Sequence, residues 1–336
     1  MRLHLHTFCG LLLALGCREE SMTSAESAST ETSSGEPSAT DSEASTGSGS
    51  SSGETSTTSS GAAASSGTTE DVPCTAAGCA CTDTCDPGLE CTEEGLCAPP
   101  GMVWVPEGEF VRGCTLADEP HCDEDEGPRM NIYVSGFAID RTEVTEAAFE
   151  ECVQAGNCVA PSCTKGIGEL PYAPVSRGDW PVDCVSWDQA AAFCAWAGKR
   201  LPTEAEWEKA ARGVDGRRFT WGNAPEPTCE YVVMDENKKG CDTGDRWAVG
   251  SKPLDNSPYG ALDMLGNVSE WVSDWYGEYD PKATTDPVGP PNGTYRVMRG
   301  GSFVSPDSVS LRTTFRSGGT PETTLSGIGF RCAWSA

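Results

Sequence analysis

Residues 181–213 place the strongest constraint on the fold, because they mark two helices and the tight link between them. Ser186 with Gln189, and Thr203 with Glu206, each form an S/T-x-x-E/Q pattern. In this capping box the hydroxyl and the later polar side chain satisfy each other's backbone amides at the start of a helix. The sequence therefore predicts one helix that begins after Ser186 and another that begins after Thr203.

Glycines and apolar side chains complete the prediction for these two helices. Gly198 and Gly213 follow the helices at the position where a left-handed C-cap residue favours glycine. One face of the first helix is apolar and is expected to enter a core: Ala190, Phe193, Cys194 and Ala197. The acidic residues Glu204, Glu206 and Glu208 are expected to cap the second helix and to face solvent, since negative charge is favourable at a helix N-terminus.

The same stretch carries a long motif, in which Val185-Ser-Trp187 is followed by Ala197-Gly-Lys-Arg-Leu-Pro-Thr-Glu-Ala-Glu-Trp-Glu208. This motif closely resembles that of the formylglycine-generating enzyme family, the sulfatase-modifying factors. Further family-like stretches flank it in the expected order: Phe137–Thr145, Pro258–Trp271, Arg299–Phe303 and Gly329–Cys332. The resemblance covers residues 100–336.

The resemblance implies an irregular α+β domain, related to C-type lectins and low in regular secondary structure. Local patterns agree, because strand-like runs alternate with long connections rich in glycine and proline: residues 131–140, 295–303, 311–316 and 328–334. A third helix is expected from Thr145 to near Gly156. Disulfides would offset part of the entropy lost when such long loops are ordered.

The N-terminal segment is typical of an exported protein. Arg2 precedes an apolar run at residues 8–16 that is too short to span a bilayer. We expect residues 1–16 to be a signal peptide and Cys17 to be the lipidated cysteine of a bacterial lipoprotein, anchored at the cell envelope. Ordinary cleavage and secretion is the alternative. Residues 17–72 are expected to be a Ser/Thr/Gly-rich disordered linker, because they lack the apolar periodicity needed for a core.

The chain has 18 cysteines, far more than a reduced cytosolic protein keeps, which indicates a compartment where disulfides persist. Six of them crowd into residues 73–99 and predict a small disulfide-stapled module: Cys74, Cys79, Cys81, Cys85, Cys91 and Cys97. A zinc site is the alternative for this module, but zinc would require reduced thiolates. The spacing of these cysteines leaves their connectivity open.

The remaining cysteines of the mature chain lie in residues 100–336. The family resemblance implies a disulfide between Cys194 and Cys332. Pairing of cysteines that are close in sequence would close short loops: Cys114 with Cys122, Cys152 with Cys158, and Cys229 with Cys241. Cys163 would then be left to pair with Cys184.

The segment after Arg299 departs from the family at the positions that carry its chemistry. In formylglycine-generating enzymes, two cysteines follow this segment, bind copper and oxidise a substrate cysteine. Their equivalents here are Ser305 and Ser310. Serine is a poor ligand for cuprous ion, which prefers thiolates, and serine has no accessible redox couple. The family's pocket tryptophan is replaced by Ser269, whereas its pocket serine is retained as Ser302.

Histidine content argues against an iron centre in place of copper. His4 and His6 belong to the signal segment, so His121 alone would remain in the mature chain. A multi-histidine iron site, as in the sulfoxide-synthase relatives of this family, is therefore excluded. His121 itself is expected to be an exposed side chain of an acidic loop.

Calcium is a better candidate cofactor, because it prefers carboxylate and carbonyl oxygens and needs no redox chemistry. The resemblance implies one calcium site, formed by the side chains of Asp263 and Glu270 and the backbone carbonyls of Gly266 and Val268. All four positions are suitable in this sequence. The alternative is that the two carboxylates make hydrogen bonds or a salt bridge without metal.

Charge and motifs limit the classes of function. The formal net charge of −28 argues against a nucleic-acid partner, which would require a basic face. The sequence has no nucleophile elbow, P-loop, dinucleotide fingerprint or zinc-protease motif. Three functions remain: an envelope-anchored family member that binds a peptide, protein or glycan; an oxidoreductase or maturation enzyme with altered chemistry in the family's groove; and formylglycine-type oxidation by other cysteines, which the serine substitutions support least.

Overall fold

The structure is a computed structural model and describes residues 77–335, except for 82–84, 94, 118, 164–176 and 239. The expected signal peptide, the lipidation site Cys17, the linker and Cys74 lie outside these residues. Among the described residues, no helix is both long and apolar enough to cross a membrane.

The helices begin where the sequence predicts. Each N-cap hydroxyl accepts a hydrogen bond from the backbone three residues later, and both capping boxes are formed. The three α-helices are α1 Glu146–Gln154, α2 Trp187–Trp196 and α3 Glu204–Arg212. Gly198 and Gly213 follow α2 and α3 with φ angles of 71° and 67°, in the left-handed region that favours glycine. These helix predictions are confirmed.

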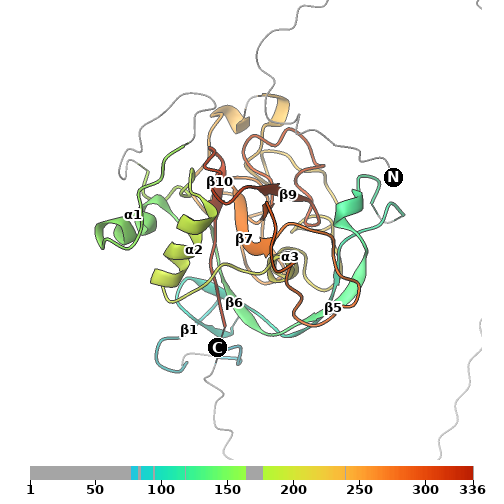
Figure 1. Ribbon diagram of the computed structural model, residues 1–336, viewed down its shortest axis with the longest axis horizontal. Coiled ribbons are helices and arrows are strands. Elements are labelled where there is room, and N and C mark those ends of the chain that lie inside the picture. The colour runs from blue at the N-terminus through green and yellow to red at the C-terminus, as the bar shows by residue number, and fades with distance from the viewer. Residues whose placement is uncertain are drawn as a thin grey trace, which may run out of the picture. The chain divides into compact units, whose positions relative to one another are not determined.

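The largest sheet has strand order β10-β7-β8-β9 and is built around β7 (Ser269–Trp275), near the centre of Figure 1. β10 (Ile328–Phe330) is parallel to β7, whereas β8 (Arg296–Arg299) is antiparallel to it. β9 (Arg316–Gly319) completes the sheet beside β8. The sheet therefore places the end of β8 next to the beginning of β7.

The other strands form three smaller antiparallel sheets. One has the order β11-β6-β3, one pairs β4 with β5, and one pairs β1 with β2. Their bounds are β1 Glu90–Cys91, β2 Cys97–Ala98, β3 Met102–Val105, β4 Gly108–Arg112, β5 Met130–Val134, β6 Phe137–Asp140 and β11 Ala333–Trp334. Together with the long connections, these elements make the irregular α+β fold expected from the sequence.

Several strand predictions need correction. The run at 131–140 is split into β5 and β6, and the run at 328–334 is split into β10 and β11, which belong to different sheets. The run at 295–303 ends after Arg299, where two glycines turn the chain. The run at 311–316 is mostly a loop, and β9 begins only at Arg316. Within that loop the Thr313 amide donates to the Arg218 carbonyl and the Phe315 amide closes a turn on Arg312, so the backbone is satisfied without a strand partner.

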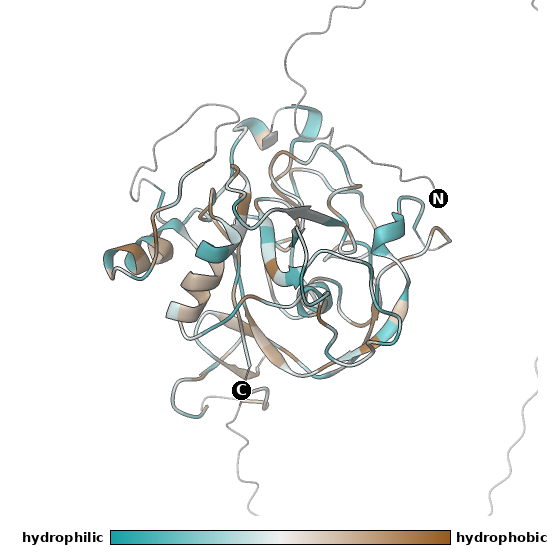
Figure 2. Cartoon of the chain, viewed as in Figure 1, coloured by the Kyte–Doolittle hydropathy of each residue, from teal (hydrophilic) through white to brown (hydrophobic). Residues whose placement is uncertain are grey.

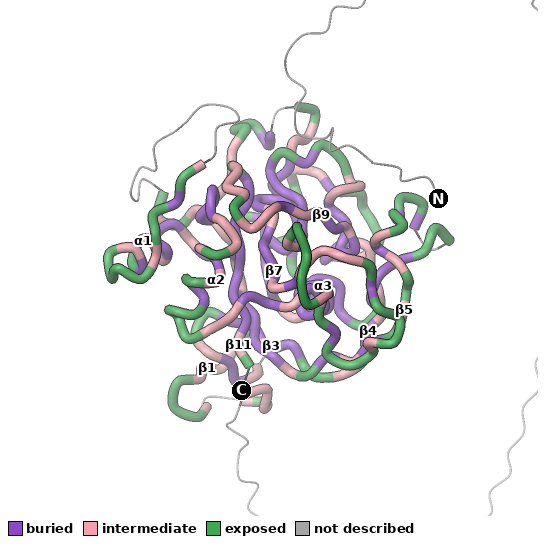
Figure 3. The backbone as a smooth tube through the Cα atoms, in the orientation of Figure 1, coloured by how far each residue is buried: buried purple, intermediate pink, exposed green. Residues whose placement is uncertain are grey.

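α3 is buried although its sequence is strongly polar. All of its residues are buried, as Figure 3 shows near the centre of the fold, whereas Figure 2 colours much of the same helix hydrophilic. The prediction that Glu204 and Glu208 face solvent is therefore wrong: they are 1% and 0% exposed. Glu206 does cap the helix, because its carboxylate accepts from the Thr203 amide.

Two apolar clusters complete the core. The larger cluster surrounds Trp207 of α3 and includes side chains from β3 to β8. The second lies between α1 and α2 and the largest sheet, where the rings of Phe149, Phe193 and Phe330 contact one another. The apolar face predicted for α2 forms part of this cluster, so the prediction is correct for Ala190, Phe193 and Cys194. It is wrong for Ala197, which is exposed just after the helix.

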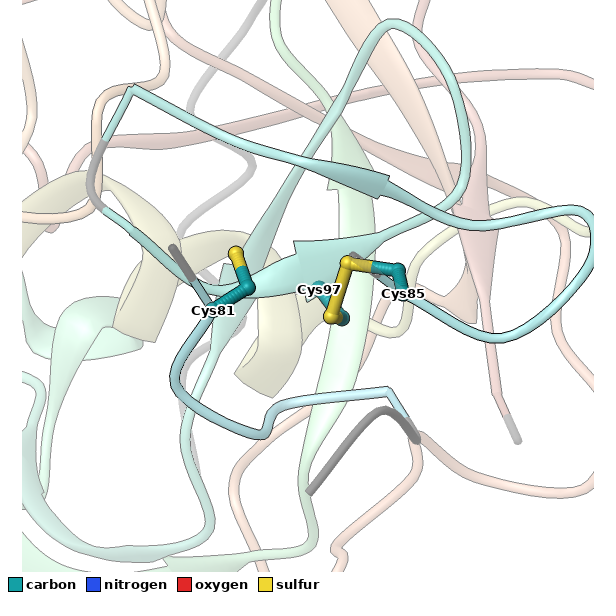
Figure 4. Close-up of side chains that lie close together, drawn as sticks. All are labelled: Cys81, Cys85 and Cys97. Atoms are coloured by element: carbon teal, nitrogen blue, oxygen red, sulfur yellow. A yellow bond between two sulfur atoms is a disulfide. The ribbon is translucent and has the colours of Figure 1, made fainter. Parts of the chain in front are cut away.

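Disulfides join the five pairs expected within residues 100–336: Cys114–Cys122, Cys152–Cys158, Cys163–Cys184, Cys194–Cys332 and Cys229–Cys241. In the N-terminal module, Cys81 pairs with Cys91 and Cys85 with Cys97, and Cys79 is also disulfide-bonded. Figure 4 shows Cys81 beside the Cys85–Cys97 bridge. Sulfur atoms in disulfides are not thiolates, so they do not form the alternative zinc site.

Candidate functional site

A glycine turn after β8 brings the two serines at the family's catalytic positions together. Gly300 and Gly301 have φ angles of 87° and 70°. A Cβ atom on Gly301 would lie 2.5 Å from the Ser310 carbonyl oxygen and 2.9 Å from Ser305 Oγ. Glycine is therefore required here for close approach as well as for backbone conformation. Ser305 and Ser310 therefore lie against the same backbone position.

Hydrogen bonds hold Ser302 and Ser305 in one turn. The Ser302 amide donates to Ser305 Oγ over 3.0 Å, and the Ser305 amide donates to the Ser302 carbonyl over 2.9 Å. Both residues are buried. Ser269, at the start of β7, donates its hydroxyl to the Gly301 carbonyl over 3.0 Å. The pocket residues Ser269 and Ser302 therefore belong to the same small site as Ser305 and Ser310.

The hydroxyl of Ser310 differs from its neighbours. Its oxygen is buried and has no hydrogen-bond partner among the described residues. A buried hydroxyl without a partner costs free energy, so it usually marks strain or a functional position. Among the described residues, it is the only fully buried side-chain oxygen of the four serines that has no partner.

Three residues that the sequence analysis did not identify complete the walls of the site. The Asp235 amide donates to the Ser305 carbonyl over 2.8 Å, and the Ser269 amide donates to the Gly327 carbonyl over the same distance. Asp183 accepts from the Gly327 amide over 2.9 Å. These contacts join segments up to 144 residues apart, so no local sequence pattern could have indicated them.

The site contains no thiol. Every cysteine that the structure describes is in a disulfide. His121 is exposed, and the only clusters of candidate metal ligands among the described residues consist of disulfide sulfurs, with Glu126 beside one of them. The described donors around Ser305 and Ser310 are therefore hydroxyl and carbonyl oxygens, which do not fit a cuprous ion.

The proposed calcium ligands lie in the loop that leads into β7. Asp263 and Gly266 both have positive φ angles, and Asp263 accepts from the Gly250 amide. Glu270 is bound on both oxygens by Arg331 and also accepts from the Trp207 indole. Glu270 therefore makes a salt bridge and Asp263 accepts a hydrogen bond, as in the metal-free alternative given above. Asp263 and the loop carbonyls also have the oxygen chemistry that calcium prefers.

An excess of carboxylates surrounds this loop. Glu143 accepts from the Val268 amide and from the Asn267 side chain. Burial, together with repulsion from Asp263 and Glu270, raises the pKa of Glu143 well above its usual range. Burial also raises the pKa of Asp263 to about 6. A divalent cation would reduce the repulsion between these carboxylates, so the loop fits calcium in charge and in ligand type. Glu270 would then interact with both the cation and Arg331.

A buried network of ion pairs fixes the end of β8 just before the glycine turn. Arg299 bonds to Glu204 over 3.2 Å and to Glu208 over 2.9 Å. Glu204 also accepts from Arg112 and from two nitrogens of Arg316. Although burial alone would raise it, the pKa of Glu204 is lowered to about 2 by Arg316, Arg299 and Arg112. The serine site is therefore positioned by charges buried in α3 and the sheet.

Comparisons with known proteins agree with the resemblance found in the sequence. The sulfatase-modifying factor enzyme 1-like domain family matches residues 90–336. The formylglycine-generating enzyme of Thermomonospora curvata is 33% identical over 284 residues, which cover 69% of this chain and 93% of that protein. The inactive C-alpha-formylglycine-generating enzyme 2 of Mus musculus is 33% identical over 287 residues, covering 72% and 88%.

Solved structures give the same result. PvdO from Pseudomonas aeruginosa has a TM-score of 0.61 at 26% identity, with 71% of this chain and 95% of that chain covered. Treponema denticola variable protein 1 shares the fold, with a TM-score of 0.56 at 24% identity, and covers 70% of this chain. On the extent of the family match and of its relatives, this chain belongs to the sulfatase-modifying factor family of formylglycine-generating enzyme-like proteins.

Proposed function

We propose that this family member is an exported binding protein whose serine site recognises a peptide, protein or glycan and does not generate formylglycine. The observation that carries the proposal is the pairing of Ser305 and Ser310 around Gly301, where the family's chemistry requires two cysteines. The scaffold around them is intact, but the described donors offer no thiolate. The relative from Mus musculus that is named inactive C-alpha-formylglycine-generating enzyme 2 supports this proposal.

Ligand arrays test the proposal. We expect the soluble Cys17→Ser chain to bind a subset of peptide or glycan spots, and we expect Ser269→Arg to abolish that binding, because a long side chain at the start of β7 would fill the site. Ser251 is an exposed serine that is not part of the serine site, so Ser251→Arg is the matched control and should bind as the parent does. Equal binding by Ser269→Arg and the parent would place recognition elsewhere.

The proposal includes anchoring through Cys17. The disulfides of the described residues support an oxidising compartment, and a lipidated cysteine after the apolar run would hold the domain at the envelope. We expect Cys17→Ser to move the protein from the membrane fraction to the soluble fraction. Retention of the variant with membranes would show that the anchor is elsewhere.

We also propose that calcium binds at Asp263 and the carbonyls of Gly266 and Val268, with Glu270 beside them. An ion at about 100 times its dissociation constant would stabilise the fold by about 2.7 kcal/mol, which corresponds to roughly 5–10 °C in the melting temperature of a domain of this size. A chelator should therefore lower the melting temperature of the parent by that amount, and Asp263→Asn should abolish the response. If the melting temperature of the parent is the same with calcium and with a chelator, no calcium site exists in this loop.

A further inference from the structure

A cavity that is chemically different from the serine site is lined by other residues. It has a volume of about 240 Å³, and none of the four serines of the serine site lines it. Its floor is formed by Arg112, Glu204 and Arg316, and its walls by residues 277–280 and 287–291 with Ala283. Cavities for drug-sized ligands occupy roughly 300–1,000 Å³. This cavity is therefore suited to a smaller molecule.

Arg112 is the unusual group of the cavity floor. It is 4% exposed, and its only side-chain hydrogen bond among the described residues joins Nη2 to Glu204 over 3.1 Å. Its Nε–H has no acceptor. An arginine has five N–H donors, and a buried guanidinium normally satisfies most of them. Nε is itself fully buried, but Nη1 donates to no described residue, so Arg112 has unused donor capacity where it lines the cavity.

Arg316, on the same cavity floor, differs from Arg112 in how many of its hydrogen-bond donors the protein uses. Its Nε and Nη2 donate to Glu204, and its Nη1 donates to the carbonyls of Asp125 and Gly277. Its donors are therefore largely occupied by the protein. The ring of Tyr279 covers one face of the Arg112 guanidinium at 3.6 Å. Since the donors lie in the guanidinium plane, this stacking leaves the edge of Arg112, and not its covered face, for a ligand.

The charges of the floor favour an anion. Four buried arginines form the network: Arg112, Arg212, Arg299 and Arg316. The acidic groups bonded within it are Glu204 and Glu208, with Asp274 accepting from the Glu204 amide. Of these groups, the cavity floor itself carries two positive charges, on Arg112 and Arg316, and one negative charge, on Glu204. A ligand carboxylate at Arg112 would offset the excess, as a buried charge requires a partner.

The rim of the cavity has the opposite character. Glu278 and Asp280 are exposed at its mouth, and Pro287, Val288 and Pro290 supply apolar wall. Two carboxylates at the mouth would repel a polyanion such as a phosphorylated ligand, and would attract an ammonium group. We propose that this cavity binds a small zwitterion, such as a free aliphatic α-amino acid, with its carboxylate on Arg112 and its ammonium group toward Glu278 and Asp280.

Calorimetric titration of the soluble Cys17→Ser chain tests this site with L-valine and two fragments of it. 3-Methylbutanoate lacks the ammonium group and isobutylamine lacks the carboxylate. We expect L-valine to bind, and each fragment to bind at least about tenfold more weakly, a loss of about 1.4 kcal/mol. Absence of L-valine binding at concentrations up to about 10 mM would overturn the proposal.

Variants assign the two ends of the ligand. Arg112→Met should abolish binding of both L-valine and 3-methylbutanoate. Asp280→Asn, at an exposed position where folding is not at risk, should weaken L-valine about tenfold and leave 3-methylbutanoate unchanged. Glu322 is exposed and does not line the cavity, so Glu322→Gln is the control and should bind as the parent does. If Arg112→Met does not fold, the test rests on Asp280→Asn. Equal weakening of L-valine and 3-methylbutanoate binding by Asp280→Asn would then contradict the proposed orientation of the ligand.

Discussion

Replacing Glu204 with Gln is expected to destabilise the folded protein by about 3–5 kcal/mol, the range observed when one partner of a buried ion pair is removed. Glu204 is 1% exposed and bonds to Arg112, Arg299 and Arg316. Glutamine keeps the shape of the side chain but leaves these guanidinium groups without their shared charge. Guanidinium-induced unfolding with intact disulfides measures the difference.

The pH dependence of stability gives the same prediction a second readout. The folded-state pKa of Glu204 is lowered to about 2 from an ordinary value of 4.5. A carboxyl group with a lowered folded pKa contributes stability that is fully present above its unfolded pKa and is lost as pH falls through the folded pKa. The stability difference between the parent and Glu204→Gln should therefore shrink between pH 4.5 and pH 2.

Glu206 provides the matched control in the same helix turn. It caps α3 and pairs with the more exposed Arg200. Glutamine at this position can keep the capping box, so Glu206→Gln removes mainly the ion pair with the partly exposed Arg200, which contributes about 0–1 kcal/mol, and should cost clearly less than Glu204→Gln. Equal effects of the two variants, or a Glu204 effect that does not change with pH, would contradict the account of the buried network.

Restoring the two cysteines is expected to produce the second large effect, a gain of copper binding. Ser305 Oγ and the Ser310 backbone lie against Gly301, so two thiolates introduced there would share one small space. Thiolates are the ligands that cuprous ion prefers. After loading with copper and ascorbate and exhaustive dialysis, Ser305→Cys/Ser310→Cys should retain about one copper per chain.

The single variants are the controls for this prediction. Ser305→Cys or Ser310→Cys alone offers one thiolate and should retain much less copper than the double variant. Ascorbate is chosen because it keeps copper reduced without breaking the structural disulfides. If the double variant retains no more copper than the single variants, the two positions are not arranged as a ligand pair.

The sequence predicts those parts of the fold that local chemistry determines. The capping hydroxyls of Ser186 and Thr203 fix α2 and α3 because their partners are three residues away. The serine site also follows from sequence, because the family motif aligns Ser302, Ser305 and Ser310 along one short segment.

Other parts of the fold depend on partners that are distant in the sequence. The carboxylate of Glu204 is buried because arginines 92 to 112 residues away enclose it, and nothing in the polar pattern of α3 indicates those arginines. The loop at 311–315 has the composition of a strand, yet contacts with Arg218 and buried ion pairs of Arg312 fix it as a loop. Asp183, Asp235 and Gly327 reach the serine site only through tertiary contacts.

The proposed binding role requires that the serine site no longer carries out the family's oxidation chemistry. The most direct test incubates the parent protein with copper, a reductant, oxygen and a peptide containing Cys-x-Pro-x-Arg, and follows the peptide mass. We predict that the peptide cysteine remains unconverted and that the dialysed protein holds no stoichiometric copper. Conversion of that cysteine to formylglycine by the parent protein would overturn this proposal.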